Sequence, residues 1–196
     1  MATDRGDGLG AGRLEVIAGP MFAGKTEELV RRVRRAQIAG RAALVVSHEL
    51  DVRSGPGRVA SHSGLEAESY TVGSAAEIPG LVEPSTVLVA VDEAQFFGGA
   101  LVDVAVELAD RGLVVVAAGL AVTFDGRPFT PLPELMAVAE HVTKLTAVCS
   151  VCGRDAAYHV RERESEPGDG DALTPVAAHV GGTETYEARC RIHRGA

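Results

Sequence analysis

Residues 19–26 constrain this chain most, because they read Gly-Pro-Met-Phe-Ala-Gly-Lys-Thr, a complete G-x-x-x-x-G-K-[ST] loop between an apolar run and a helical pattern. Such a loop turns successive backbone N–H groups inward around a phosphate, and glycine permits the required torsions and close approach. We expect Lys25 to place its charge near the terminal phosphates, and Thr26 to offer its hydroxyl to Mg²⁺. The alternative is an ordinary glycine-rich strand-to-helix turn, which the complete match and its position disfavour.

The surrounding pattern predicts an α/β fold with a doubly wound parallel sheet. Four short runs are nearly continuous in β-branched or small apolar residues, as strands covered on both faces should be; they are residues 14–18, 42–47, 87–91 and 113–118. A helix is expected from about Thr26 to a stop at Gly40, and another over residues 100–111. Ligands of such sheets gather at the carboxyl ends of the strands.

Composition narrows the functional classes. The net charge of −8 argues against a broad nucleic-acid surface, which needs clustered positive charge. The first helix carries four arginines, for which a solvated face or a subunit contact is favoured over nucleic-acid binding: Arg31, Arg32, Arg34 and Arg35. The chain has no apolar stretch of about 20 residues and no signal peptide, so we expect a soluble, cytoplasmic protein with neither membrane nor nucleic-acid partners.

The spacing of cysteine and histidine predicts a closed zinc site. Cys149 and Cys152 form a C-x-x-C pair, and Cys190 and His193 form a C-x-x-H pair much later in the chain. Four such ligands suffice for tetrahedral zinc, and because no ligand position is left open, the metal would be structural. The alternative keeps Cys149 and Cys152 as a buried or redox pair and His193 as a surface residue.

The change in composition after Leu145 predicts a second, smaller domain. We expect a disordered N-terminal tail at residues 1–12, a nucleotide-binding α/β domain at 13–145, and a zinc-binding domain at 146–196. The last of these contains a long polar loop, which in a compact protein is usually functional or disordered.

Two adjacent acids, Asp92 and Glu93, directly follow the third apolar run, where P-loop enzymes place a second Mg²⁺ determinant. Asp92 would hold the metal, directly or through water, and Glu93 would act as a base on a substrate hydroxyl or a water. The alternative is a pair of solvated acids at a strand end. Aromatic residues near the strand ends could stack on a planar base, although each one singly suits the core better.

Several motifs, in this order, resemble the zinc-containing, P-loop (type II) thymidine kinases. Besides the loop formed by Gly19, Pro20, Met21, Phe22, Ala23, Gly24, Lys25 and Thr26, they are Asp51-Val52-Arg53, Asp92-Glu93-Ala94-Gln95-Phe96-Phe97, Gly126-Arg127-Pro128-Phe129, Lys144-Leu145-Thr146-Ala147-Val148-Cys149, and Gly181-Gly182 with Tyr186. The likeness spans about residues 13–193. It implies transfer of the γ-phosphate of ATP to the 5′-hydroxyl of thymidine in nucleotide salvage for DNA synthesis. It further implies a P-loop NTPase-like fold, a zinc ribbon whose lasso loop closes over the nucleoside, a homotetramer, and feedback inhibition by dTTP.

The resemblance also implies roles for individual residues. Glu93 would take the proton of the 5′-hydroxyl, Thr26 and Asp92 would serve Mg²⁺, and Asp51 and Arg53 would act at the phosphate-transfer centre with Gln95 nearby. Side chains matching those that enclose thymine and sugar are Met21, Phe96, Leu120, Phe124, Phe129 and Tyr186. The base edge would be held by lasso backbone near Ala177 and His179.

The chain departs from the family pattern at three places. The fourth zinc ligand is often cysteine and here is His193, Ala121 and Val122 stand where relatives frequently carry an acid and a small or polar residue, and residues 162–171 are long and acidic. Two other functional classes compete. A nucleic-acid-dependent ATPase is disfavoured by the short, acidic chain, and a non-catalytic ATP-binding scaffold is disfavoured by the spare base at Glu93.

Overall fold

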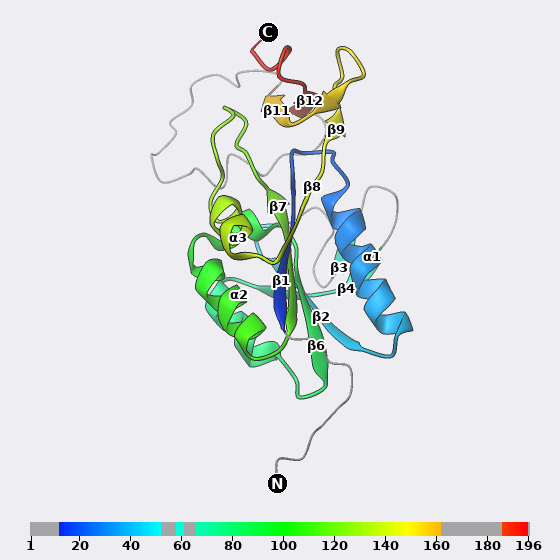
Figure 1. Cartoon of the computed structure of the whole chain (residues 1–196), viewed down its shortest axis with the longest axis vertical. Coiled ribbons are helices and arrows are strands. Elements are labelled where there is room, and N and C mark those ends of the chain that lie inside the picture. Colours follow the sequence, from blue (N-terminus) through cyan, green and yellow to red (C-terminus); the bar gives the residue numbers. More distant parts are fainter. Residues whose placement is uncertain (1–11, 52–57, 61–65, 162–185, 196) are drawn as a thin grey trace.

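A six-stranded parallel sheet forms the centre of the protein in the computed structural model, which describes residues 12–51, 58–60, 66–161 and 186–195. The strand order is β5-β2-β6-β7-β1-β8, and every neighbouring pair is parallel. The strands are β1 (Arg13–Gly19), β2 (Ala42–His48), β5 (Tyr70–Val72), β6 (Thr86–Val91), β7 (Val114–Leu120) and β8 (His141–Lys144). Their carboxyl ends point toward the upper end of the molecule in Figure 1.

The four strands predicted from apolar runs are confirmed as β1, β2, β6 and β7. β7 is buried along its whole length, because it lies inside the sheet and is covered on both faces. The edge strands β5 and β8 are not predicted by the sequence pattern. They are only 3 and 4 residues long and are mostly exposed or half-buried, so they carry no continuous apolar run.

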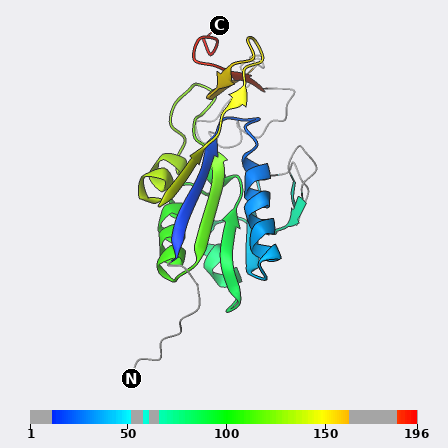
Figure 2. The same ribbon diagram turned by 45° about the vertical axis from the view of Figure 1, so that its right-hand side comes forward.

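Helices cover both faces of the sheet (Figure 1 and Figure 2). The helix α1 (Lys25–Ile38) packs on one face, and η1 (Ala75–Leu81), α2 (Ala100–Asp110) and α3 (Leu132–Val138) pack on the other. Alternate residues of β1 serve the two cores, with Val16 on the α2 side and Ile17 on the α1 side. The predicted doubly wound α/β fold is therefore confirmed.

The first helix begins at the end of the predicted phosphate loop. Two acids, Glu27 and Glu28, lie in its first turn, where negative charge is favourable next to the positive end of the helix dipole. Its apolar stripe, including Leu29 and Val33, is fully buried against the sheet. After the helix, Gly40 adopts a φ of 70°, which glycine tolerates best, and the chain turns into β2.

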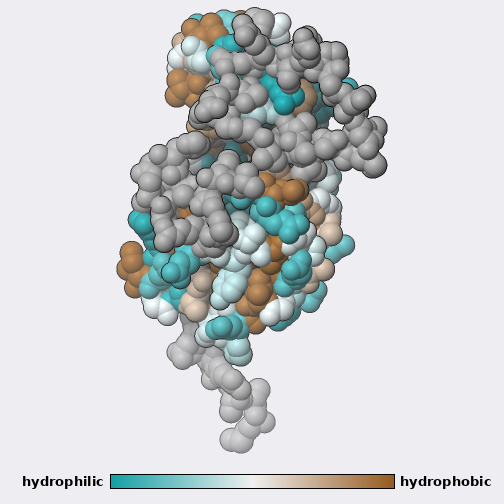
Figure 3. Space-filling model, turned by 180° about the vertical axis from the view of Figure 1, so that it is seen from behind, coloured by the Kyte–Doolittle hydropathy of each residue, from teal (hydrophilic) through white to brown (hydrophobic). Residues whose placement is uncertain are grey.

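Beyond the carboxyl ends of the strands lies a small module, which we define as residues 147–161 and 186–195. It contains two antiparallel strand pairs: β9 (Ala147–Val148) with β10 (Asp155–Ala156), and β11 (Tyr158–Arg161) with β12 (Tyr186–Arg189). It has a separate apolar cluster of five small buried residues, namely Ala147, Cys149, Ala156, Ala188 and Cys190. Tyr158, His159 and Tyr186 are buried in the module as well. Figure 3 shows hydrophobic residues on the surface of this upper part as well.

Two shorter elements complete the described part of the chain. The strands β3 (Arg58–Ala60) and β4 (Glu66–Glu68) pair antiparallel, and Val59 packs into the core beneath α1. The tail expected at residues 1–12 lies outside the described residues except for Gly12. Among the helices that the structure describes, none combines the length and the apolar character that crossing a bilayer requires.

Candidate active site

The loop after β1 takes up two left-handed backbone conformations. Gly24 has a φ of 79° and Phe22 a φ of 65°, and α1 begins at the next residue, Lys25. Glycine adopts such torsions at little cost, whereas a side chain at position 24 would be strained. The loop therefore curls at the N-terminus of α1, which is the geometry of an anion-binding turn.

Lys25 is folded back onto this loop. The residue is 8% exposed, and its Nζ donates a hydrogen bond to the carbonyl oxygen of Pro20 over 2.7 Å. A lysine ammonium carries three donors, so this bond fixes the direction of the side chain while using one of them. The positive charge is consequently held at the loop rather than in bulk solvent.

A direct hydrogen bond joins the loop to the end of β6. Thr26 Oγ1 donates to Asp92 Oδ2 over 3.0 Å, and Asp92 is 2% exposed. The backbone N–H of Asp92 also donates to the carbonyl of Val46 in β2 over 3.0 Å, which fixes where β6 ends. A hydroxyl and a carboxylate side by side at a phosphate loop are the ligands that Mg²⁺ prefers. Their role as Mg²⁺ ligands stays a prediction.

Glu93 follows immediately and is held in an unusual conformation. Its backbone is left-handed, with φ 47° and ψ 46°, and the residue is 5% exposed. Non-glycine residues in this region cost on the order of 1 kcal/mol and persist where the surroundings fix them. Here the chain turns directly from β6 into η2 (Ala94–Phe97), and that turn aims the carboxylate.

Gln95 links this carboxylate to the end of β7. Its Nε2 donates to Glu93 Oε2, and its Oε1 accepts from the backbone N–H of Leu120 over 2.9 Å. Leu120 is in turn the register partner of Gly19, where the phosphate loop begins. Space for Gln95 exists because residue 119 is glycine: a Cβ there would lie 2.7 Å from Gln95 Oε1. Loop, acid pair and β7 end are thus one connected assembly.

The residues predicted to enclose a nucleoside are in varied environments. Leu120, Phe129 and Tyr186 are buried, Met21 and Phe96 are half-buried, and Phe124 is 36% exposed. Phe124 and Phe129 belong to a loop closed by Thr123 N–H bonding to Arg127 O over 2.8 Å and Phe129 N–H bonding to Ala121 O over 3.1 Å. This closure shows how the loop after β7 is ordered despite Ala121 and Val122. The contacts of these side chains with a nucleoside stay predictions.

The small module touches the same loop. A Cβ at Gly126 would lie 3.5 Å from Arg194 Nη1 and 3.8 Å from Tyr158 Cδ1. The guanidinium carbons of Arg194 and Arg191 lie 4.5 and 5.3 Å from the centroid of the Tyr158 ring. No sequence pattern indicates these residues, because nothing in their spacing shows that the C-terminus returns to this loop.

Three predicted site residues, Arg53, Ala177 and His179, lie outside the described residues, so their placement is not tested. Asp51 is described: it is half-buried three residues after the end of β2, and its N–H donates to the carbonyl of His48 over 2.9 Å. His48 is a buried residue that the sequence analysis missed. The one signal for it was a histidine at the end of a strand that is apolar from Ala42 to Val46.

The four predicted zinc ligands converge. One ligand atom from each of Cys149, Cys152, Cys190 and His193 lies within 4.8 Å of all the others. Cys152 Sγ lies 3.8 Å from Cys190 Sγ, and His193 Nδ1 lies 3.7 Å from Cys149 Sγ and 3.3 Å from Cys190 Sγ. Zn–S bonds of about 2.3 Å in a tetrahedron give S···S edges of about 3.8 Å. The cluster therefore fits zinc.

Electrostatics favour a cation at this cluster. Burial raises the pKa of the Cys149 thiol. Hydrogen bonds from the backbone of Cys190, Val151 and Cys152 and from the His193 side chain outweigh burial and lower this pKa from 9.0 to about 5. The Arg154 N–H lowers the pKa of Cys152, whereas burial and the neighbouring thiols raise it, with a net increase. One thiolate thus forms at neutral pH, and its negative charge disfavours the ionisation of a second thiol. A bound divalent cation offsets the repulsion between the thiolates.

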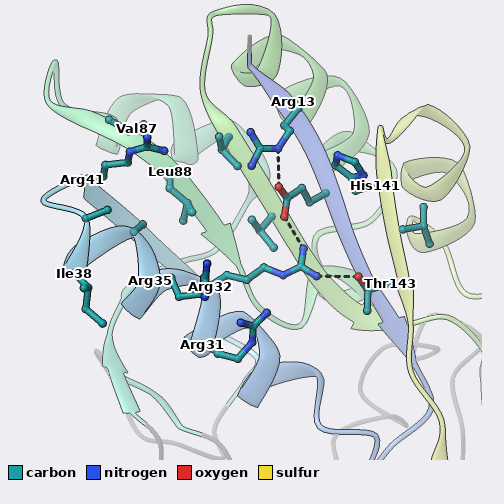
Figure 4. A pocket seen from close by; sticks show the side chains of 16 residues that line it. Arg13, Arg31, Arg32, Arg35, Ile38, Arg41, Val87, Leu88, His141 and Thr143 are labelled. Atoms are coloured by element: carbon teal, nitrogen blue, oxygen red, sulfur yellow. Dashed lines mark hydrogen bonds and ion pairs between the residues drawn. The ribbon is translucent and has the colours of Figure 1, made fainter. Parts of the chain in front are cut away.

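The arginines of α1 do not form a uniform solvated face. Arg32 is 16% exposed and donates to Glu15 (2.5 Å), Glu28 (2.9 Å) and Thr143 Oγ1 (2.8 Å), so it ties the helix to β1 and β8. It lines a groove of about 870 Å³ with Arg13, Arg35 and Arg41 (Figure 4). The groove lies at the amino ends of the strands, away from the phosphate loop. Arg31 is 54% exposed, as expected for a solvated residue.

With this geometry established, comparison with known proteins identifies the family. Residues 12–194 match the thymidine kinase family. The chain belongs to the thymidine kinase family. A thymidine kinase of Bdellovibrio bacteriovorus is 47% identical over 182 residues, which are 93% of this chain and 85% of that protein. A thymidine kinase of Halobacterium salinarum is 48% identical over 185 residues, 92% of this chain and 93% of that protein.

Two solved structures are much more distant from this thymidine kinase family member. A Bacteroides Pif1 bound to single-stranded DNA is 15% identical with a TM-score of 0.37, and the match covers 68% of this chain and 38% of that one. A large terminase from a thermophilic bacteriophage is 12% identical with a TM-score of 0.39, over 73% of this chain and 43% of that one. Likenesses this weak have no bearing on the function of this chain.

Proposed function

We propose that this chain transfers the γ-phosphate of ATP to the 5′-hydroxyl of thymidine and so produces dTMP. One observation carries the proposal: the hydrogen bond between Thr26 and Asp92 joins a phosphate-binding loop to a buried acid pair whose second member is Glu93. Membership of the thymidine kinase family gives the acceptor its identity. ATP and Mg²⁺ follow from the kinase family and from the loop.

The phosphate loop and Lys25 bind the triphosphate in this scheme. Backbone N–H groups of the loop and the N-terminus of α1 bind the triphosphate, while the Lys25 ammonium stabilises the negative charge on the transferred phosphoryl group. Thr26 and Asp92 would hold Mg²⁺, which neutralises charge on the phosphates when it is bound. Asp51 and Arg53 assist at the same centre, with Gln95 nearby.

Glu93 is the base in this scheme. Its carboxylate accepts the proton of the 5′-hydroxyl as that oxygen attacks the γ-phosphorus, and the P–O bond to ADP breaks. The N–H donor of Gln95 on Oε2 orients the carboxylate without supplying a charge that would weaken it as a base. Rigid placement matters here because phosphoryl transfer asks a protein for positioning and charge neutralisation.

The nucleoside would lie among apolar and aromatic side chains beyond this centre. These are Met21, Phe96, Leu120, Phe124, Phe129 and Tyr186, with backbone near Ala177 and His179 at the base edge. The zinc held by Cys149, Cys152, Cys190 and His193 would be structural, because four protein ligands complete its coordination. We further propose a homotetramer inhibited by dTTP, and a division into an α/β domain (13–145) and a zinc-binding domain (146–196).

Transfer of labelled phosphate from ATP tests the proposal. We expect labelled dTMP with thymidine and little product with deoxycytidine, and we measure deoxyuridine in parallel to define the base preference. ATP hydrolysis that depends on DNA or RNA, without transfer to a nucleoside, would contradict the proposal. ATP binding with neither transfer nor hydrolysis would also contradict it and would favour a scaffold. Light scattering with and without dTTP tests the tetramer separately.

A further inference from the structure

His48 connects two segments of the proposed transfer site, although the proposed mechanism gives it no role. It is the last residue of β2, at the same edge of the sheet as Asp92, and it is only 6% exposed. A histidine buried there, rather than the apolar residue that a strand end would accept, needs a reason. Its neighbours supply one, because they come from three different elements.

On one side the ring holds the turn that leads to Asp51. The backbone N–H of Leu50 donates to His48 Nδ1 over 3.1 Å, and the N–H of Asp51 donates to the His48 carbonyl over 2.9 Å. Nδ1 must therefore be the unprotonated nitrogen of a neutral imidazole. The Gly73 backbone also interacts with the ring and favours its protonated form.

On the other side the ring packs against η2. The Phe97 ring lies 4.8 Å away at 77°, an edge-on contact, and the Phe96 ring lies 6.1 Å away at 51°. The Phe96 N–H donates to the Glu93 carbonyl over 3.0 Å, so the position of Phe96 is coupled to that of the acid. One side chain therefore contacts both the turn before Asp51 and the turn after Glu93.

We propose that neutral His48 is a positioning residue that sets the Asp51 turn relative to the Glu93–Phe97 turn in the transfer site. This inference rests on the proposed function. A positive His48 would present an N–H at Nδ1 to the N–H of Leu50, so the hydrogen bond would be lost and the two turns would separate. His48 therefore supports the reaction only in its neutral form.

Charged groups around the ring act on this equilibrium. Burial lowers the pKa of His48 below its ordinary value of 6.5, against the opposing effects of Glu49, the Gly73 backbone and Glu77. Glu49 lies on the turn itself and Glu77 on η1, while η2 contributes no charge of its own and is preceded by Asp92 and Glu93. Because burial dominates, His48 stays neutral at pH 7 and becomes charged only in acid, at a pH below its ordinary pKa of 6.5.

Two variants separate positioning from general stability. His48→Asn keeps an acceptor for the Leu50 N–H, whereas His48→Phe keeps the ring but removes the acceptor. We expect kcat for thymidine to fall about tenfold in His48→Phe and to stay within about threefold in His48→Asn. We expect the KM for thymidine to rise only in His48→Asn, because only that variant loses the contact with Phe96. An acid decline of kcat below about pH 6.5 in the wild type should be absent in His48→Asn.

Amide exchange of Leu50, followed by NMR, gives a readout that does not depend on activity. Exchange should be slow in the wild type and in His48→Asn, fast in His48→Phe, and less protected in the wild type as the pH falls below about 6.5. Equal kcat and equal Leu50 exchange in the two variants would overturn the inference, whatever their melting temperatures. Failure of the wild type to phosphorylate thymidine would instead overturn the proposed function, and Leu50 exchange would still decide the role of His48.

Discussion

At the residue scale, the Thr26 hydroxyl is the link between the phosphate loop and the acid pair. It donates to a nearly fully buried carboxylate, so its loss affects both a proposed Mg²⁺ ligand and a side-chain bond that ties α1 to Asp92. The same oxygen atom thus serves both as a proposed Mg²⁺ ligand and as the hydrogen-bond donor to Asp92. Removing it should therefore change how the rate depends on the Mg²⁺ concentration.

Thr26→Ala should therefore raise the Mg²⁺ concentration needed for half-maximal rate and lower kcat/KM about 10- to 100-fold, the range for losing one hydrogen bond to a charged group. Mg²⁺ titration of the labelled-phosphate assay measures both quantities. Thr26→Ser is the matched control, because it keeps the hydroxyl and should retain most activity. Equal losses in the two variants, without a change in Mg²⁺ dependence, would contradict the role of the hydroxyl.

At the element scale, α1 owes part of its stability to Glu28. Hydrogen bonds from Arg31, and then from Arg32, lower the pKa of this carboxyl from 4.5 to about 2, although burial opposes them. A carboxyl whose pKa is lower in the folded state stabilises the fold above its unfolded pKa of 4.5, and this stabilisation is lost as the pH falls through about 2.

Glu28→Gln should accordingly reduce the free energy of unfolding by roughly 1–3 kcal/mol at pH 7, after allowance for the partial exposure of the pair. The difference from the wild type should shrink as the pH is lowered from 4.5 toward 2. Urea unfolding across this pH range measures it. Glu83→Gln, at an exposed residue outside α1, should show no such difference, and a pH-independent effect at position 28 would contradict the account.

A second contact between elements joins the small module to the loop after β7. Arg194 stacks on Tyr158 beside Gly126, and that loop carries Phe124 and Phe129. Arg194→Ala should remove the cation–π interaction with Tyr158, which is worth about 0.5–1 kcal/mol. We expect the KM for thymidine to rise about two- to fivefold and the KM for ATP to stay unchanged. Steady-state kinetics test this, with the exposed Arg154→Ala as control. A rise in the KM for ATP would show that the contact acts elsewhere.

At the scale of the whole molecule, the two parts should differ in their response to metal. The small module has one apolar cluster of five small residues, with Tyr158, His159 and Tyr186 also buried, whereas the α/β part has two extensive cores. A core this small rarely supports folding without a metal or a disulfide. The structural zinc is therefore expected to hold one part of the molecule and not the other.

Removing zinc with a chelator should thus increase amide exchange in residues 147–161 and 186–195, leave the α/β part folded, and abolish thymidine phosphorylation while ATP still binds. Metal analysis of the untreated protein should give one zinc per chain. Cys190→Ser should behave like the chelated protein, and Ser150→Ala, beside the cluster, should keep its zinc. Zinc-free protein that remains fully ordered and active would contradict the structural role.

The sequence predicts some parts of this molecule better than others. Buried central strands are visible because both faces are covered, and the phosphate loop and the zinc pairs are visible because their spacing is local. The sequence does not reveal edge strands such as β8, the hydrogen bonds by which Arg32 ties α1 to β1 and β8, or the contacts of His48. Most of their contacts are with residues that are distant in sequence, and the histidine and arginine involved carry no pattern of their own.

The central claim is that Glu93 removes the proton of the acceptor hydroxyl beside a phosphate loop that binds ATP independently. The most direct test compares Glu93→Gln with the wild type and with Glu83→Gln in single-turnover transfer to thymidine, with ATP affinity measured by calorimetry. Loss of a base predicts a decrease in rate of about 10²- to 10⁴-fold at unchanged ATP affinity. A Glu93→Gln protein that phosphorylates thymidine at the wild-type rate would contradict the account.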